Sequence, residues 1–291
     1  MSAQDLGHAS ALACAALWAV STVLFGAAAQ SVSARALNLL KCSLAAALLC
    51  GTALVLGDVP ALSSRDTIAL SVSAVLGIVI ADTAYFVALK HLGAARGVLF
   101  VSLVPVCTSL AAVPMLGEAL TARMLLGMAL TLTGVVVVVR ARSPSSAPSA
   151  STLPGIVGGV VYCTAQALAN VLTKSADPSL SPLALSAFRL LVGASIIALS
   201  LVVTARGRAE VRALKPVLPR GSLATLCGAY FGLLLGTYAL RTVTAGIATT
   251  LIATTPLFAM VIARVIGKET PLPRMLLGAV VALAGVALLV L

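Results

Sequence analysis

A series of long apolar runs, separated by short polar breaks, constrains the fold of this chain more than any other feature. A helix needs about 20 mostly apolar residues to cross the hydrocarbon core of a bilayer. Of the 291 residues, 60% are hydrophobic and 9% are charged, whereas soluble domains average roughly 45–50% and about 25%. Lipid must therefore cover part of the surface. We predict an all-α polytopic membrane protein with ten transmembrane helices, over residues 8–29, 34–56, 67–89, 94–116, 122–140, 153–173, 181–204, 221–240, 244–266 and 273–291.

An internal repeat relates the two halves of the chain. With a shift of 151 positions, residues 85–140 align with 236–291 without a gap, and 15 of the 56 aligned positions are identical. The run Arg-Met-Leu-Leu-Gly at 123–127 recurs unbroken at 274–278. Further upstream the shift becomes 148, where Lys41 aligns with Arg189. A period of this length indicates a duplicated structural unit.

The repeat divides the chain into a first five-helix transmembrane repeat (1–140), a linker rich in Ser, Pro and Ala (141–152) and a second five-helix transmembrane repeat (153–291). Because each copy has an odd number of helices, the second copy must enter the membrane from the opposite side. Such an inverted repeat is common in secondary transporters, whose binding site lies at the repeat interface near the middle of the membrane. The sequence therefore predicts a 5+5 inverted repeat that works by alternating access.

A set of short motifs lies in the first copy, and part of it recurs in the second. They are Ala88-Leu89, Gly93-Ala94, Pro105, Gly117-Glu118, Gly127 and Gly134 in the first, and Ala239-Leu240, Pro256, Glu269, Gly278 and Gly285 in the second, with Phe188-Arg189 in the seventh helix. With these motifs the chain resembles the ten-helix EamA-type branch of the drug/metabolite transporter superfamily. It departs from the pattern at Lys268, which aligns with Gly117, and at Lys41, where Arg is commoner.

The resemblance implies a secondary active transporter for small metabolites, such as amino acids or drugs. It also implies export as the usual direction and the bacterial plasma (inner) membrane as the location. The motifs identify the superfamily and leave the substrate open. We expect a small-molecule solute, the lipid bilayer and protons as partners, no nucleic acid, no cofactor, no metal, and a monomer or weak homodimer.

Asp82 is the acidic residue that lies deepest within a predicted helix, and its counterpart in the second copy is Leu233. A charged side chain in the membrane usually faces a cavity or a partner. Two interpretations stay open. Asp82 couples transport to protons or binds a substrate amine, or else it forms a structural pair with Lys41 or reaches water near the helix end.

Lys41 and Arg189 occupy matching places in the second and seventh predicted helices. Either they attract an anionic substrate group or balance Asp82, or they bind helix ends and extend toward the membrane surface. Their presence in both copies favours the structural interpretation.

Polar and aromatic side chains within the predicted helices are the expected lining of a substrate cavity. Residues three or four apart share a helix face, which groups Tyr85 and Phe86 with Asp82, and Gln166 with Asn170. The alternatives are aromatic residues at the lipid interface and hydrogen bonds between helices. The predicted lining is Trp18, Thr22, Asp82, Tyr85, Phe86, Tyr162, Gln166, Asn170, Tyr230 and Tyr238.

Three repeated residue types have predicted architectural roles. Pro105 and Pro256 are expected to kink the fourth and ninth helices from within. The glycine pairs of the fifth and tenth helices fall on one face of each helix and predict a close helix–helix seam; they are Gly127 with Gly134 and Gly278 with Gly285. Glu118 and Glu269 precede those same helices and are expected to cap them.

The net charge of +11 comes from basic residues that lie mostly between the apolar runs. We count 13 Lys and Arg in or beside odd-numbered loops and four beside even-numbered ones. Because basic loops stay in the cytoplasm, this distribution predicts termini on the outer side, whereas the family resemblance favours cytoplasmic termini. The first apolar run follows a segment without Lys or Arg, so we expect it to remain as a helix and not to be a cleaved signal peptide.

Other functional classes lack support in the sequence. The histidines, His8 and His91, lie far apart, and the six cysteines have no metal-ligand spacing. No nucleotide-binding loop or selectivity-filter motif is present. A membrane enzyme or a channel without a recognisable motif is the alternative to a transporter, and we expect no enzymatic activity.

Overall fold

The structure is a computed structural model that describes residues 2–59, 61–101, 103–141, 153–265 and 273–290. Within these ranges it is helical, without strands. Most of the predicted linker 141–152 and the predicted cap Glu269 lie outside the described residues. In chain order the elements are α1 (Ala3–Ala29), α2 (Ala34–Leu56), α3 (Ser64–Ala74), the π-helix η1 (Val75–Ala81), α4 (Asp82–Val101), α5 (Val104–Leu116), α6 (Ala122–Ala141), α7 (Leu153–Lys174), α8 (Pro182–Val202), α9 (Ala205–Arg212), the 3₁₀-helix η2 (Lys215–Val217), α10 (Leu218–Thr225), the π-helix η3 (Leu226–Gly232), α11 (Leu233–Thr242), α12 (Ala245–Ile252), α13 (Thr255–Val265) and α14 (Pro273–Val290).

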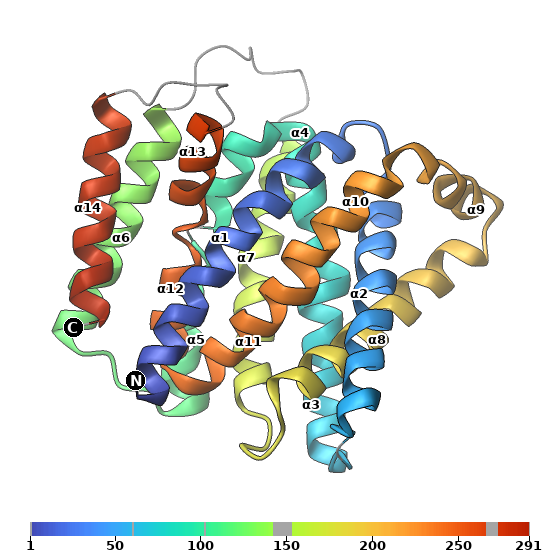
Figure 1. Ribbon diagram of the computed structural model, residues 1–291, viewed down its shortest axis with the longest axis horizontal. Helices are drawn as coiled ribbons and strands as arrows, with labels where there is room; N and C mark the ends of the chain where they lie inside the picture. Colours follow the sequence, from blue (N-terminus) through green and yellow to red (C-terminus); the bar gives the residue numbers. More distant parts are fainter. Residues whose placement is uncertain (1, 60, 102, 142–152, 266–272, 291) are drawn as a thin grey trace.

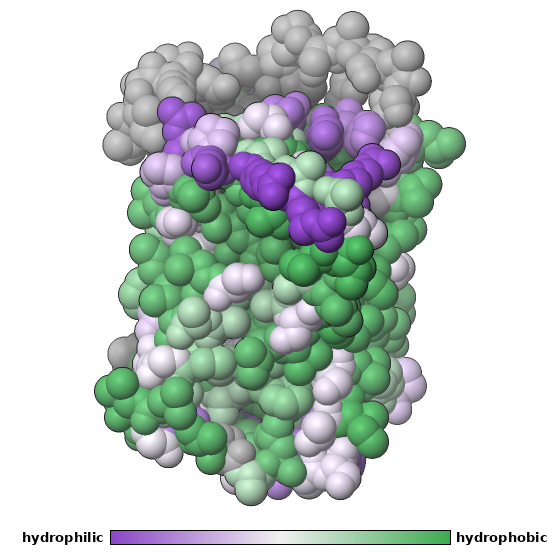
Figure 2. Space-filling view, turned by 90° about the vertical axis from the view of Figure 1, so that its right-hand side faces the viewer, coloured by the Kyte–Doolittle hydropathy of each residue, from purple (hydrophilic) through white to green (hydrophobic). Residues whose placement is uncertain are grey.

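The predicted fold class is confirmed. Among the described residues, six helical stretches are long and apolar enough to cross a membrane, and four shorter apolar helices supply the rest of the ten spans. Large apolar side chains point outward from these spans, with Leu54 70% exposed and Leu199 67% exposed. Figure 2 shows the resulting hydrophobic band below a rim of hydrophilic side chains. Lipid accounts for this exposure, because soluble monomers rarely leave such large apolar patches uncovered.

Local sequence signals determine where several helices begin and end. Ser33 and Ser181 occupy equivalent positions, 148 apart, and each accepts a hydrogen bond from the first turn of the following helix, α2 or α8. A serine side chain at this position satisfies a backbone N–H that lacks a helical partner. Gly57 ends α2 and Gly117 ends α5 with positive φ angles of 68° and 66°, a conformation that glycine adopts without strain.

Two predicted boundaries were wrong. The predicted loop at 90–93 is part of α4, and the predicted loop at 205–220 contains α9 and η2. Residues 90–93 lack proline and contain one glycine, so their polar character did not prevent helix formation. Polarity is a weaker breaking signal than loss of a backbone donor.

The two repeated prolines interrupt their helices more completely than predicted. Pro105 lies in the first turn of α5 and Pro256 in the first turn of α13, and the preceding helices end at Val101 and Ile252. The prediction of a kink within a continuous helix was therefore wrong. Proline is well tolerated at the start of a helix, where its missing N–H would have no helical acceptor.

The first helix of each copy packs against helices of the other copy. In the first copy α1 packs against η3 and α11 of the second, and α7 of the second copy packs against η1 and α4 of the first. The equivalent helices α2 and α8 pack against each other, as do α6 and α14. Figure 1 shows α6 and α14 side by side at one edge of the bundle, and α1 beginning at the end of the molecule where α14 finishes. We call this end the terminus end.

Glycines bring α6 and α14 into backbone contact. A methyl group at Gly127 would lie 2.8 Å from Leu289 Cγ and 3.1 Å from the Gly285 carbonyl oxygen. A methyl group at Gly134 would overlap the backbone of Ala282 and Gly278. Close approach through small residues is a usual means of helix association in membranes.

We expect Gly134→Ala to destabilise the protein, because the added methyl group would force the two backbones apart. Overpacking of this kind costs about 1–3 kcal/mol, or roughly 3–10 °C in the thermal unfolding midpoint. The midpoint can be measured in detergent by loss of the monodisperse chromatographic peak. Gly51→Ala is the matched control, because nothing lies within 4 Å of a methyl group there. Equal midpoints for the two variants would contradict a glycine-dependent seam.

Candidate functional site

A cavity of about 120 Å³ lies between the two copies. A smaller space of about 40 Å³ continues from it and shares the lining residues Trp18, Val101, Tyr162, Gln166, Arg189 and Leu233. The main cavity is lined by Trp18, Ser21, Thr22, Phe25, Lys41, Gly77, Ile78, Asp82, Tyr85, Phe86, Leu89, Val101, Tyr162, Gln166, Arg189, Leu190, Gly228, Ala229, Leu233 and Thr255. Both copies therefore contribute to its wall.

Two π-helices form equivalent parts of this wall. The segment η1 covers 75–81 and η3 covers 226–232, which is the repeat shift of 151 at each end. A π-turn widens the helix and is often found at functional sites. The Ile78 carbonyl in η1 accepts a hydrogen bond of 2.7 Å from Asn38 Nδ2, and the Gly228 carbonyl in η3 accepts one of 3.0 Å from Trp18 Nε1. These side chains satisfy backbone groups that lipid could not.

Equivalent glycines let the first helix of each copy approach the π-helix of the other. A methyl group at Gly77 would lie 2.8 Å from Ala169 Cβ in α7 and 3.0 Å from Arg189 Nη2. A methyl group at Gly228 would lie 2.7 Å from Ser21 Cβ in α1. The shift of 148 relates Ser21 to Ala169, so the two contacts repeat each other. Gly77 also leaves the space that the Arg189 side chain occupies.

The structure brings Asp82 and Lys41 together at the cavity wall. Lys41 Nζ donates to Asp82 Oδ2, and the two side chains are 27% (Asp82) and 12% (Lys41) exposed. The same ammonium group lies 5.7 Å from the centroid of the Phe86 ring, within range of a cation–π attraction. Asp82 thus has both features that the sequence left open, a position on the cavity and an ion pair with Lys41.

Arg189 lines both parts of the cavity and is 3% exposed. Its Nε has no hydrogen-bond partner. Among the described residues, no carboxylate forms an ion pair with it. A buried guanidinium without an acid is costly, so this group differs from its symmetry equivalent, Lys41.

Aromatic rings cover much of the remaining wall. The Tyr85 and Tyr162 rings lie 4.8 Å apart, and Phe25 meets Phe86 edge to face at 5.4 Å. Sequence reasoning missed Phe25 and Ser21, although both follow Trp18 at helical spacing and share its face. Extending that face by one further turn would have identified them.

Eight of the ten predicted lining residues border one of the two spaces. Trp18, Thr22, Asp82, Tyr85, Phe86, Tyr162 and Gln166 line the main cavity, and Asn170 lines its extension, where it accepts a hydrogen bond of 2.9 Å from Gln166.

Tyr230 and Tyr238 do not line either space. The Tyr230 hydroxyl lies 2.8 Å from Thr52 Oγ1 in α2, and Tyr230 packs in the apolar cluster between α2 and α8. Gly228 and Ala229 of η3, with Leu233 at the start of α11, line the main cavity instead. A helical wheel with 3.6 residues per turn could not give this register.

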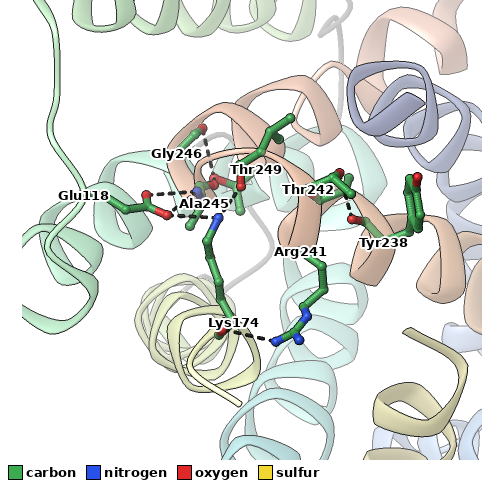
Figure 3. Close-up of polar contacts among 10 residues, drawn as sticks. Glu118, Lys174, Tyr238, Arg241, Thr242, Ala245, Gly246 and Thr249 are labelled. Atoms are coloured by element: carbon green, nitrogen blue, oxygen red, sulfur yellow. Dashed lines mark hydrogen bonds and ion pairs between the residues drawn. The ribbon is translucent and has the colours of Figure 1, made fainter. Parts of the chain in front are cut away.

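A polar cluster joins the copies at the terminus end (Figure 3). The Glu118 carboxylate lies 3.0 Å from Lys174 Nζ and accepts hydrogen bonds of 3.1 and 3.0 Å from the backbone N–H of Ala245. Lys174 also donates to the Val243 carbonyl. Arg241 donates to the Ala176 carbonyl at 2.8 Å.

Glu118 therefore caps α12, in the other copy, and not α6 as predicted. Thr121 accepts from the N–H of Met124 at the start of α6. An acid before a helix was a correct capping signal, but the sequence did not indicate which helix end it would reach. Among the described residues, no three His, Cys, Asp or Glu side chains lie close enough together to hold a metal ion.

Comparisons with known proteins add three findings. A solved crystal structure of a protein is similar to this chain over 97% of this chain and 95% of that one, with a TM-score of 0.72 and 18% sequence identity, which is a likeness of fold. No curated protein matches the chain.

A model of the EamA-like transporter family matches the chain twice, over residues 5–140 and 153–291. The two matches coincide with the two copies of the internal repeat. Both matched segments line the cavity, since each contributes one of the two π-helices in the cavity wall. This multi-pass membrane protein belongs to the EamA-like transporter family.

Proposed function

We propose that the chain is a secondary active transporter that carries small metabolites through the central cavity by alternating access. Membership of a transporter family, whose members are not enzymes, supports the general class. The observation that carries the proposal is the position of the cavity between two inverted copies, each of which supplies one π-helix. Equivalent walls allow the cavity to open on either side with similar packing.

We propose export across the bacterial plasma membrane as the direction and location, which follow from the family resemblance. The test is a comparison of metabolites in the medium and cytoplasm of cells that overexpress the protein and cells that lack it. A solute that is enriched in the medium of overexpressing cells should exchange across liposomes that contain the purified protein. Failure of every such solute to exchange would contradict the proposal.

The polar cluster at the terminus end supports closure of the cavity on that side. It links the loop after α5 in the first copy with α7 and α12 in the second, through side chains that are 10% (Glu118) and 19% (Lys174) exposed. Asn170, in the smaller space, lies one helical turn from Lys174 on α7. Opening this end requires separation of Glu118 from Lys174 and from α12.

We expect Glu118→Gln to favour opening of the terminus end, because it removes the ion pair and weakens the cap on α12. A cysteine at Asn170, in a background without the native cysteines, should then react about fivefold faster with a polar thiol reagent, the population change that corresponds to about 1 kcal/mol. Glu210→Gln is the matched control, because Glu210 pairs with Arg35 at 2.9 Å between α9 and α2. Equal rates for Glu118→Gln and the parent protein would argue against this closure.

We propose that the pair of Asp82 and Lys41 couples transport to protons. Transfer of a proton to the Asp82 carboxylate would remove its attraction for Lys41 and would change the charge on the cavity wall. The pair lies on the cavity wall, which gives it contact with a bound solute. An intramembrane acid beside a transport pathway is a common proton relay.

With the solute identified as above, we expect Asp82→Asn to abolish the part of uptake into liposomes that depends on a pH gradient, because asparagine cannot exchange a proton. Asp177→Asn, on the exposed turn after α7, is the control and should keep that dependence. Asp82→Asn leaves Lys41 without its acidic partner, and a buried unpaired cation destabilises the fold. The double variant Asp82→Asn with Lys41→Gln removes this cation, so loss of coupling in the double variant is not caused by misfolding from an unpaired charge. Unchanged pH dependence in Asp82→Asn would refute coupling through this residue.

A further inference from the structure

The counter-charge of Arg189 is missing from its symmetry-equivalent position. The shift of 148 relates Lys41 to Arg189, and the shift of 151 relates Asp82 to Leu233. Lys41 pairs with Asp82, whereas the position equivalent to Asp82 in the second copy holds an apolar residue that cannot pair with Arg189. Arg189 and Leu233 both line the main cavity and its extension. The second copy thus keeps the cation and lacks the acid.

The cavity consequently carries one unbalanced positive charge. Among the residues that the structure describes, the charged lining side chains are Lys41, Asp82 and Arg189, which sum to two positive charges minus one negative charge, or +1. Arg189 is 3% exposed, its Nε has no partner, and it has no ion pair within the part of the chain that the structure describes. A charge removed from water in this way requires an opposite charge nearby.

The rest of the wall indicates the body of the ligand. Apart from the three charged residues, the described lining residues are uncharged, and five of them carry aromatic rings, namely Trp18, Phe25, Tyr85, Phe86 and Tyr162. A single anionic group with an apolar body matches this surface. A dianion such as a phosphate monoester would leave a negative charge without a partner.

We infer that Arg189 binds the carboxylate of the transported solute, in the place where the first copy has Asp82, and that the solute is a monocarboxylate with an apolar body. The planar guanidinium offers parallel donors that match a carboxylate. Gly77 leaves room for this geometry, because a methyl group there would lie 3.0 Å from Arg189 Nη2. The inference rests on the proposed transport function and specifies the substrate class of the same cavity.

Two probes of equal shape test the inference with the purified full-length protein in detergent. They are 3-phenylpropionate and its amide, 3-phenylpropanamide. At ten times its Kd, the acid should raise the thermal unfolding midpoint by roughly 3 °C, whereas the amide should leave it unchanged. Equal shifts with acid and amide, or no shift with either, would overturn carboxylate recognition.

A substitution at Leu233 tests the site itself. Leu233→Asp supplies the acid that the first copy has, so it should pair with Arg189 and weaken binding of 3-phenylpropionate at least about tenfold, for a loss of about 1.4 kcal/mol. Leu233→Asn, which has the same shape without the charge, should bind the acid within about twofold of the parent protein. Equal affinities in the two variants would overturn the placement at Arg189.

A second pair of variants covers the case in which Leu233→Asp does not fold. Arg189→Gln should lose the response to the acid, and Arg189→Lys should keep part of it, since the ammonium group retains the charge without the fork. Retention of the full response in Arg189→Gln would overturn the inference. Exchange of a neutral or cationic solute by the protein, with no response to the acid, would refute this substrate class and leave the transport proposal standing.

Discussion

The packing of each copy's first helix on the π-helix of the other copy determines where everything else in the bundle lies. The helices α1 and η3, and α7 and η1, meet at equivalent glycines, so no side chain separates their backbones. In lipid, association depends on close packing and on satisfied backbone groups more than on burial of apolar surface. The hydrogen bonds from Asn38 and Trp18 to the π-helices meet the second requirement. The cavity remains between these two contacts because neither copy can complete its own wall.

Much of the fold was accessible from the sequence because hydropathy and repetition are properties of long segments. Ten spans and their division into two copies require no knowledge of side-chain geometry. The misplaced boundaries came from giving local polarity too much weight as a helix-breaking signal and proline too little. Residues 90–93 looked polar but kept their backbone donors, whereas Pro105 and Pro256 lacked a donor and separated helices that had looked continuous.

Of the ten residues predicted to line a substrate cavity, eight border the two spaces, and the two that do not are Tyr230 in η3 and Tyr238 in α11. In α1 and α7, a spacing of three or four placed Trp18, Thr22, Gln166 and Asn170 on the correct faces. In η3 the wider turn rotated Tyr230 toward α2, and nothing in the composition of Leu226–Gly232 indicates a π-helix. The internal repeat relates η1 to η3, which occur at equivalent positions, whereas helical periodicity indicates neither π-helix. The helix that Glu118 caps could not be predicted from the sequence, because only the tertiary structure brings α12 next to Glu118.

One contact at the terminus end connects secondary structure with conformational change. The Glu118 carboxylate serves at once as ion-pair partner of Lys174 and as the acceptor for the first turn of α12. Separation of the copies at this point would leave a lysine without its counter-ion and a helix start without its cap, two losses that occur together because one side chain makes both contacts. Under the proposed alternating access, an intermediate degree of separation would break both contacts and restore neither, so this end would have two stable positions, closed and fully open.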